Sequence, residues 1–225
     1  IRNVDLVPEA PKTWDEVRAI SEALVAEGLY GLVIRTDSPY HSYPIVTAFG
    51  GYIFGFNEDG TYNTADIGLN SEGGIAAAQW ISGMYVADLM PQNIGENEMY
   101  DLFSTGQAAL IIDGPWSSQR IVDSAETGGF TYSIDSFPGV EGVSENGAPF
   151  AGGQGFFISA FSENQLLAET FLLDFVATVD VMKRLTQRIP AFVGVVVEDP
   201  NIEFFIQAGL NAQPMPLIPE IGAVW

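Results

Sequence analysis

The sequence predicts an α/β fold, because short buried strands and helices alternate along the chain. The apolar runs 31–34 and 107–112 have the length of buried strands, and a segment with helical features precedes each of them. Apolar residues make up 47% of the 225 residues, enough for a core, which excludes a disordered chain. Domains commonly contain ~100–200 residues, so the length fits one large domain or two small ones.

The first third of the chain predicts a helix, a buried strand and a polar loop. Thr13 and Glu16 have the spacing of a capping box, and apolar residues then recur at helical intervals up to Gly28. Strand 31–34 leads into loop 36–44, which carries two prolines and two tyrosines. Ligands of open α/β sheets bind beyond the carboxyl ends of strands, so this loop is a candidate site.

A β-hairpin and a long helix are expected next. Asn57–Gly60 has the composition of a tight turn between strands 52–56 and 62–66. The long helix is predicted from about Ser71 to Leu89. Its expected apolar side comprises Ile75, Ala78, Trp80, Ile81, Tyr85 and Leu89.

The remaining elements follow the same alternation. Pro115 suits the first turn of a helix that begins after strand 107–112. Three glycines within 151–155 indicate either a close approach of the backbone or a hinge. The other predicted elements are helix 96–104, strand 130–137, a glycine-rich acidic loop 139–149, strand 156–160, and helices 163–178, 180–188 and 200–211.

The charge and the residue types exclude several classes of protein. Twenty-nine acidic residues against eight basic ones give a net charge of −21, which disfavours nucleic acid and anionic membrane surfaces. Without cysteine there is no thiol catalysis, thiolate metal site or disulfide. No apolar run approaches the ~20 residues of a membrane helix.

Enzyme and cofactor motifs are also absent from the sequence. His41 is the single histidine, and its loop predicts an exposed surface or hydrogen-bonding role rather than catalysis. The glycines of 151–155 form no dinucleotide fingerprint, and there is no P-loop, so no cofactor is expected. The acidic segment 141–145 lacks EF-hand spacing, so no metal site is expected. A glycosidase pair cannot be singled out among 29 acids.

The aromatic residues point to a flat, hydroxyl-rich ligand. Tyr40 and Trp116 lie on proline-containing corners after predicted strands, where their rings could stack on the apolar face of a sugar. Trp14 and Trp80 fit helical segments and are expected in the core. Trp225 is the last residue and has no pattern of its own.

Several motifs occur in an order that resembles a known family. They are Pro11–Trp14 before a helix, Ser38–Tyr40, Ala48–Tyr52, Gly114–Trp116, Pro149–Gly153, and Met215–Pro219 leading to Trp225. Together they cover essentially the whole chain and closely resemble the maltose/maltodextrin-binding proteins of bacterial ABC importers. These belong to the family 1 extracellular solute-binding proteins.

The resemblance implies a set of ligand contacts. Tyr40, Trp116 and Trp225 match the family's sugar-stacking aromatics, and Pro39 matches a neighbouring contact. Ser38 stands where maltose binders typically carry a glutamate, and Tyr43 stands in place of a tryptophan. The resemblance therefore implies the aromatic platform and leaves the sugar open.

It also implies a type II periplasmic-binding-protein-like fold of two α/β lobes that close on sugar about a hinge. Residues 1–150 and 201–225 would form the carboxy-terminal lobe, and 151–200 would cross into the other lobe. The amino-terminal lobe would be largely missing, so the chain would be a fragment or one piece of a longer protein. Gly152 and Gly153 would lie at the hinge.

The function implied is the substrate-binding component of an ABC sugar importer, which binds maltose or maltodextrin without catalysis. Its partners would be the oligosaccharide, the membrane permease and the missing lobe or a partner fragment. It would be exported, to the periplasm or lipid-anchored on the outer face of the membrane. The alternatives are a binding protein for another oligosaccharide or a sugar alcohol, a polysaccharide-active enzyme, and a receptor-docking module.

Overall fold

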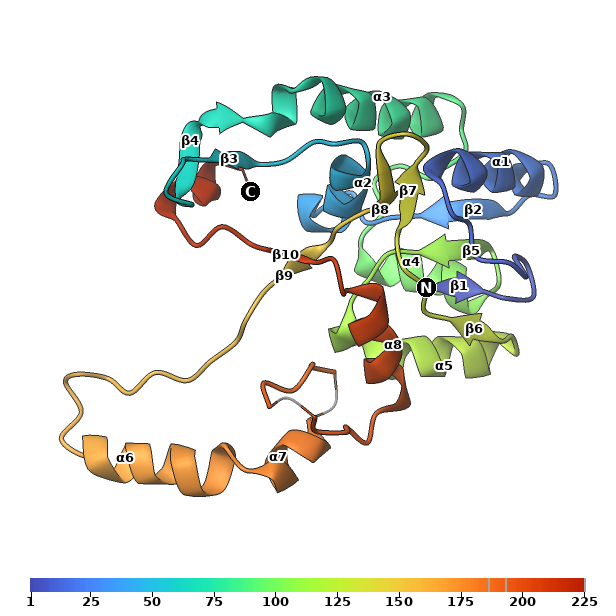
Figure 1. Cartoon of the computed structure of the whole chain (residues 1–225). Coiled ribbons are helices and arrows are strands. Elements are labelled where there is room, and N and C mark those ends of the chain that lie inside the picture. The colour runs from blue at the N-terminus through green and yellow to red at the C-terminus, as the bar shows by residue number, and fades with distance from the viewer. Residues whose placement is uncertain (186, 193, 225) are drawn as a thin grey trace.

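A four-stranded mixed sheet with helices on both faces forms the main body (Figure 1). The computed structural model describes residues 1–185, 187–192 and 194–224. The strands are β1 (Arg2–Asn3), β2 (Tyr30–Val33), β5 (Ala108–Ile111) and β6 (Tyr132–Ser133), in the order β2-β5-β1-β6. β2 runs parallel to β5, whereas β1 is antiparallel to both β5 and β6. This arrangement confirms the α/β prediction.

Alternate residues of the central strands face two separate cores. Leu32 and Leu110 lie in one core, whereas Val33 and Ile111 lie in the other. The first core packs against α1 (Trp14–Val25), α2 (Tyr43–Ala48) and α3 (Glu72–Val86). The second packs against α4 (Glu96–Ser104), α5 (Ser118–Gly128) and α8 (Pro200–Ala208).

The predicted start of the first helix is confirmed. Thr13 caps α1, because its Oγ1 accepts a hydrogen bond from the Glu16 N–H at 3.1 Å. Glu16 reaches back to the Lys12 N–H at 2.6 Å. Trp14 and Trp80 are both buried, as expected, and their rings meet edge to face with centroids 5.2 Å apart.

Three small two-stranded sheets surround the main one. The predicted hairpin is confirmed as β3 (Phe54–Phe56) and β4 (Tyr62–Ile67). The expected loop 139–149 instead contains a second hairpin, β7 (Pro138–Val140) and β8 (Ser144–Asn146), in which Gly142 takes the left-handed conformation with φ of 77°. β9 (Phe150–Ala151) pairs in parallel with β10 (Gln213–Pro214).

The expected loop 36–44 is largely helical. Pro39–Ser42 forms a 3₁₀ turn, and α2 follows it directly. Pro39 and Pro44 each lie in the first turn of their helix, where the missing N–H is tolerated. The two prolines therefore begin helices in a segment that their presence had marked as a loop.

The predicted buried side of α3 is wrong at two positions. Ile75 is 48% exposed and Ala78 is also exposed, whereas Gly74, Ala77 and Met84 are buried with Trp80. Small or apolar residues occur around the whole helix, so periodicity does not identify its inward face. Packing against α1 and α2 decides which side is covered.

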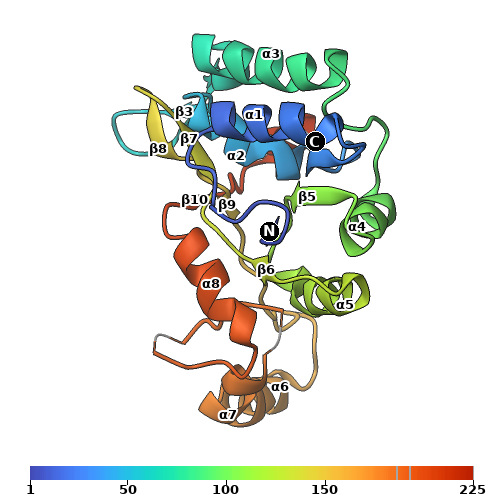
Figure 2. The ribbon, with the colours of Figure 1, turned by 90° about the vertical axis from the view of Figure 1, so that its right-hand side faces the viewer.

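Residues 152–199 leave the main body (Figures 1 and 2). They contain α6 (Gln165–Phe171), a π-helical stretch (Leu172–Val176) and α7 (Val179–Arg184). A final 3₁₀ turn, Pro219–Ala223, lies after this segment and after α8. The predicted strand 156–160 does not form, because no strand among the described residues pairs with it, and Phe157 is 97% exposed. Helix 163–178 is confirmed in shortened form, whereas the helix predicted to reach 188 ends at Arg184.

A pair of alanine substitutions tests the corrected side of α3. Met84→Ala empties a fully buried position, so it should lower the free energy of unfolding by about 2–5 kcal/mol. Ile75→Ala, the matched control on the same helix, should change it by less than about 0.5 kcal/mol. Urea unfolding followed by circular dichroism measures both. Equal losses would contradict the assigned inward face.

Candidate functional site

The candidate site lies where β2 and β5 end. Because these neighbouring strands are parallel, their carboxyl ends reach the same edge of the sheet and bring the segments 35–43 and 113–117 together. The rings of Tyr40 and Trp116 lie there with centroids 5.9 Å apart and planes at 61°. Both side chains are partly buried. The two aromatics singled out from sequence are therefore neighbours.

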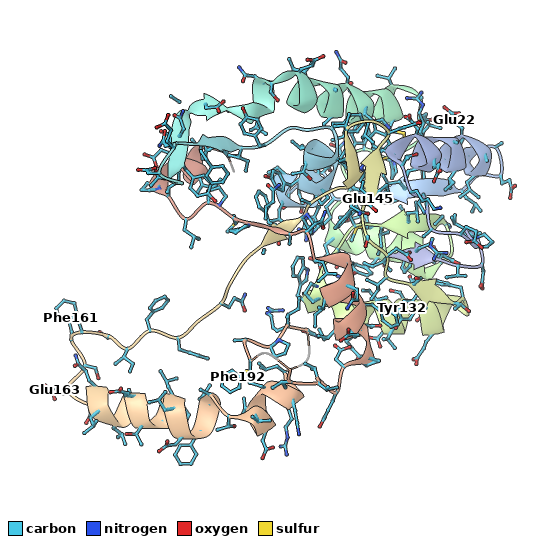
Figure 3. The ribbon with its side chains drawn as sticks, in the orientation of Figure 1. Glu22, Tyr132, Glu145, Phe161, Glu163 and Phe192 are labelled. Carbon is cyan, nitrogen blue, oxygen red and sulfur yellow. The ribbon has the colours of Figure 1, made fainter. Side chains whose placement is uncertain are left out.

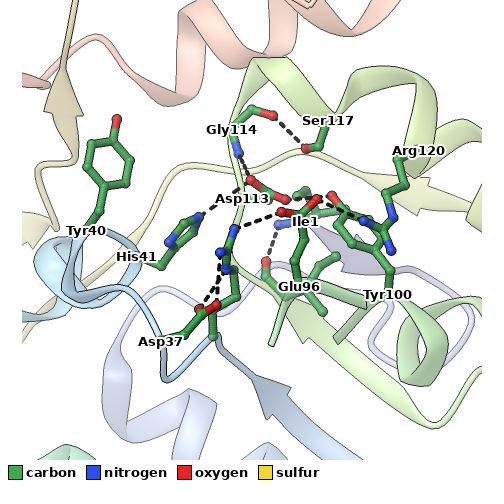
Figure 4. Close-up of polar contacts among 12 residues, drawn as sticks. Ile1, Asp37, Tyr40, His41, Glu96, Tyr100, Asp113, Gly114, Ser117 and Arg120 are labelled. Carbon is green, nitrogen blue, oxygen red and sulfur yellow. Dashed lines mark hydrogen bonds and ion pairs between the residues drawn. The ribbon is translucent and has the colours of Figure 1, made fainter. Parts of the chain in front are cut away.

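Asp113 is a buried carboxylate beside this aromatic pair (Figure 4). Its side chain is 0% exposed, and it accepts hydrogen bonds from the Tyr100 hydroxyl and from the Gly114 N–H, each at 2.8 Å. Burial opposes ionisation, but the His41 imidazole, the Tyr100 hydroxyl and the Gly114 N–H outweigh it and lower the pKa of Asp113. The site thus holds an ionised carboxylate away from water.

The predicted exposure of His41 is wrong. The side chain is buried between Tyr40 and Trp116, with ring centroids 5.6 Å and 6.3 Å away. Its Nε2 lies 3.7 Å from Asp113 Oδ1, beyond hydrogen-bond distance, so the contact is electrostatic. The 3₁₀ turn that begins at Pro39 directs this side chain inward instead of into solvent.

Tyr43 is linked to Tyr40 through Phe150, which packs against both rings. Its ring stacks on Phe150 with centroids 3.6 Å apart and planes at 2°, and its hydroxyl donates to Gln213 Oε1 at 3.1 Å. Burial raises the pKa of Tyr43 to about 12, so the phenol stays protonated. Phe150 covers one face of the ring, and Tyr43 as a whole is only 6% exposed.

The other predicted site residues lie in three different segments of the chain. Ser38 and Pro39 begin the 3₁₀ turn that carries Tyr40, and Pro39 is exposed. Gly152 and Gly153 follow β9, and an added Cβ at either would meet nothing within 4 Å. Trp225 lies outside the described residues.

Two arginines at the rim of the site had not been predicted from sequence. Arg35 pairs with Asp37 at 3.0 Å and with Glu96 at 2.9 Å, and Arg120 pairs with the same Glu96 at 2.8 Å. A hydrogen bond from Arg35 lowers the pKa of the exposed Asp37 carboxyl. The available signal was position, because Arg35 follows a buried strand directly in a chain with eight basic residues.

The described part of the chain contains neither a candidate metal cluster nor a candidate membrane-spanning helix. No group of three His, Asp or Glu side chains is arranged there to hold a metal ion. Among the same residues, no helix has the length and apolar character needed to cross a bilayer.

Comparison with known proteins decides the family. The family model for bacterial extracellular solute-binding proteins matches residues 1–183. The chain belongs to this family. The description of the family is one of solute binding and names no catalytic activity. The resemblance drawn from the motifs is confirmed.

The relatives of this solute-binding protein bind sugars, according to their names. A galactooligosaccharide-binding protein of Bacillus subtilis is 32% identical over 237 residues, covering 99% of this chain and 55% of that protein. A maltodextrin-binding protein of the same species is 29% identical, with 99% and 56% covered. A maltooligosaccharide-binding lipoprotein of Streptococcus pneumoniae is 28% identical, with 99% and 55% covered. The chain spans about half the length of these curated relatives.

The buried carboxylate predicts a difference in acid stability. Because folding lowers the pKa of Asp113, its ionised form contributes stability that is present above the ordinary pKa of about 3.9 and is lost as pH falls through the folded value. Asp113→Asn should therefore lose less unfolding free energy than the wild type between pH 6 and pH 3. Urea unfolding at both pH values measures this.

The exposed Asp101→Asn, on α4, is the matched control and should follow the wild type. If Asp113→Asn lost as much stability as the wild type, the carboxylate would not be stabilised by its neighbours.

Proposed function

We propose that this solute-binding protein serves an ABC sugar importer and binds oligosaccharides by stacking them on Tyr40 and Trp116. The observation that carries the proposal is the meeting of these two partly exposed rings at the carboxyl edge of the sheet, 5.9 Å apart. Aromatic faces suit the apolar face of a pyranose. Trp225, Pro39, Ser38 and Tyr43 would complete the contacts, as the family resemblance implies.

Two oligosaccharide classes are candidates. Maltose and maltodextrins fit the motif order, and two of the relatives are named for maltodextrin or maltooligosaccharide. Galactooligosaccharides are the second candidate, because the relative at 32% identity is named for them. Ser38, at a position where maltose binders typically carry a glutamate, keeps this second candidate open.

A second lobe would complete the binding cleft. Residues 151–200 would pack against it, with 1–150 and 201–225 forming the carboxy-terminal lobe. The support is the apolar surface of the departing segment, which projects from the main body around Phe161 and α6 (Figure 3). Its exposed large side chains are Phe156, Phe157, Phe161, Leu166, Leu167, Phe171, Leu173 and Phe175.

Opening and closing would occur where residues 152–199 leave the main body. β9, which precedes this segment, pairs with β10, and Gly152 and Gly153 follow β9 with open space around them. A sugar bound to both lobes would favour the closed state, which the membrane permease would recognise. The protein would be exported to the periplasm or lipid-anchored outside the membrane, as the name of a streptococcal relative suggests for that protein.

Sugar titration tests the function. Maltose, maltotriose, maltotetraose and galactooligosaccharides are titrated into the chain, with binding measured by calorimetry and tryptophan fluorescence. Trp116→Ala should weaken binding by about tenfold, since truncating an aromatic anchor commonly costs more than about 1 kcal/mol.

Trp80→Phe is the matched control, because it also removes a tryptophan. Trp80 belongs to α3 and lies in the first core, away from Tyr40 and Trp116. Its buried Nε1 has no hydrogen-bond partner among the described residues, so the substitution strands no acceptor. Unchanged affinity in Trp116→Ala, or no binding of any of these sugars, would contradict the proposal.

Self-association tests the role of residues 151–200. An isolated chain with this apolar surface should associate reversibly as its concentration rises, because each buried large apolar side chain contributes about 1.5–3 kcal/mol. Replacing Leu166, Leu167 and Phe171 with glutamine should restore a monomer in sedimentation velocity. Val86→Gln, on the exposed side of α3, should not. A wild type that stays monomeric at all concentrations would contradict this role.

A further inference from the structure

His41 is enclosed by the candidate sugar platform without a polar partner that satisfies it. It is 6% exposed, and neither Nδ1 nor Nε2 has a hydrogen-bond partner among the described residues. Its ring lies edge to face against Trp116 at 88° and against Tyr40 at 68°. His41 therefore contacts both rings of the proposed sugar platform, Tyr40 and Trp116.

The charged groups around His41 come from several elements (Figure 4). Asp113, after β5, is the nearest at 3.7 Å, and Tyr100 of α4 donates to that carboxylate. Asp37 and Arg35 precede the turn and pair with each other, and Arg35 also binds Glu96, which binds Arg120.

The α-amino group of Ile1 also lies near Asp113 in this chain. It donates to the Ile111 carbonyl at 2.9 Å, and burial lowers its pKa to about 6. This amine therefore titrates in the same pH range as an ordinary imidazole, and a test of His41 must separate the two.

We infer that His41 is a positioning residue of the sugar platform and that it takes up a proton when a sugar stacks on Tyr40 and Trp116. This role rests on the proposed function. A bound sugar displaces water from the rings that enclose His41, which lowers the local dielectric. The attraction between a protonated imidazole and the Asp113 carboxylate 3.7 Å away then becomes stronger.

The coupling has a defined sign. If binding favours the protonated imidazole, sugar affinity is highest at low pH and falls as pH rises through the titration of the bound protein. By reciprocity, the sugar must shift the His41 titration to higher pH by the same free energy. A histidine that only fills space between two rings would show neither effect.

The experiment uses the single histidine of the chain. In protein without an affinity tag, the imidazole Cε1–H signal belongs to His41 and needs no assignment. It is followed by NMR from pH 5 to 9, without sugar and with a saturating concentration of one sugar. That sugar is maltotriose, or the galactooligosaccharide if that is the one that binds in the sugar titration. The same sugar is titrated by calorimetry at pH 5.5 and 8. We expect its affinity to be about fivefold higher at pH 5.5, and the His41 signal to titrate at higher pH in the complex.

Two variants separate His41 from its neighbours. His41→Phe keeps a ring of similar size between Tyr40 and Trp116 and retains the Ile1 amine, so it should abolish the pH dependence of affinity. Asp113→Asn should shift the His41 titration of the sugar-free protein to lower pH, whereas Asp101→Asn should leave it unchanged.

Each outcome decides the inference. Equal affinity at the two pH values, the same pH dependence in His41→Phe, or a His41 signal whose titration the sugar does not move would overturn it while leaving the proposed function intact. If the wild type binds none of the sugars at either pH, the proposed function fails and the inference with it.

Discussion

The parallel pairing of β2 with β5 is the contact on which the candidate site depends. It places Val33 opposite Ile111, the last residue of each strand, so the following segments leave the sheet side by side. Tyr40 and Trp116 are 76 residues apart in sequence, and only this register brings their rings within 5.9 Å. A one-residue slip would also exchange the two cores, since alternate residues face opposite sides of the sheet.

The second constraint is the buried Asp113 carboxylate. A charge without partners is costly to bury, and here the Tyr100 hydroxyl, the Gly114 N–H and the imidazole of His41 surround it. Tyr100 is in turn covered by the Arg120 guanidinium, whose carbon lies 4.1 Å from the ring centroid. The two aromatic rings proposed to meet the sugar thus lie beside a polar network that includes Tyr100 of α4 and Arg120 of α5, in which Asp113 is buried and Arg120 is partly exposed.

The sequence was informative wherever a local signal determines the structure. Thr13 with Glu16 determines the start of α1, and the Asn57–Gly60 turn determines the β3–β4 hairpin. Position after a strand also predicted Tyr40 and Trp116 as ligand candidates, and the structure places their rings side by side. The failures occur where distant packing decides the outcome. Ile75 was placed inside because α3 is apolar on several sides, and His41 was placed outside because its burial depends on Trp116, which lies far along the chain.

The strand predicted at 156–160 also fails because its formation depends on residues elsewhere in the protein. Its apolar run has the composition of a buried strand, but a strand needs a neighbour to pair its backbone groups, and none of the described residues supplies one. Phe157 and Phe161, each 97% exposed, contrast with the fully buried Phe103 of the main body. The main body thus has cores of its own, whereas residues 156–175 have the composition of a core but expose their large apolar side chains. In the proposed two-lobed cleft, the stacking face would be rigid before the sugar arrives, whereas residues 152–199 would move with the second lobe.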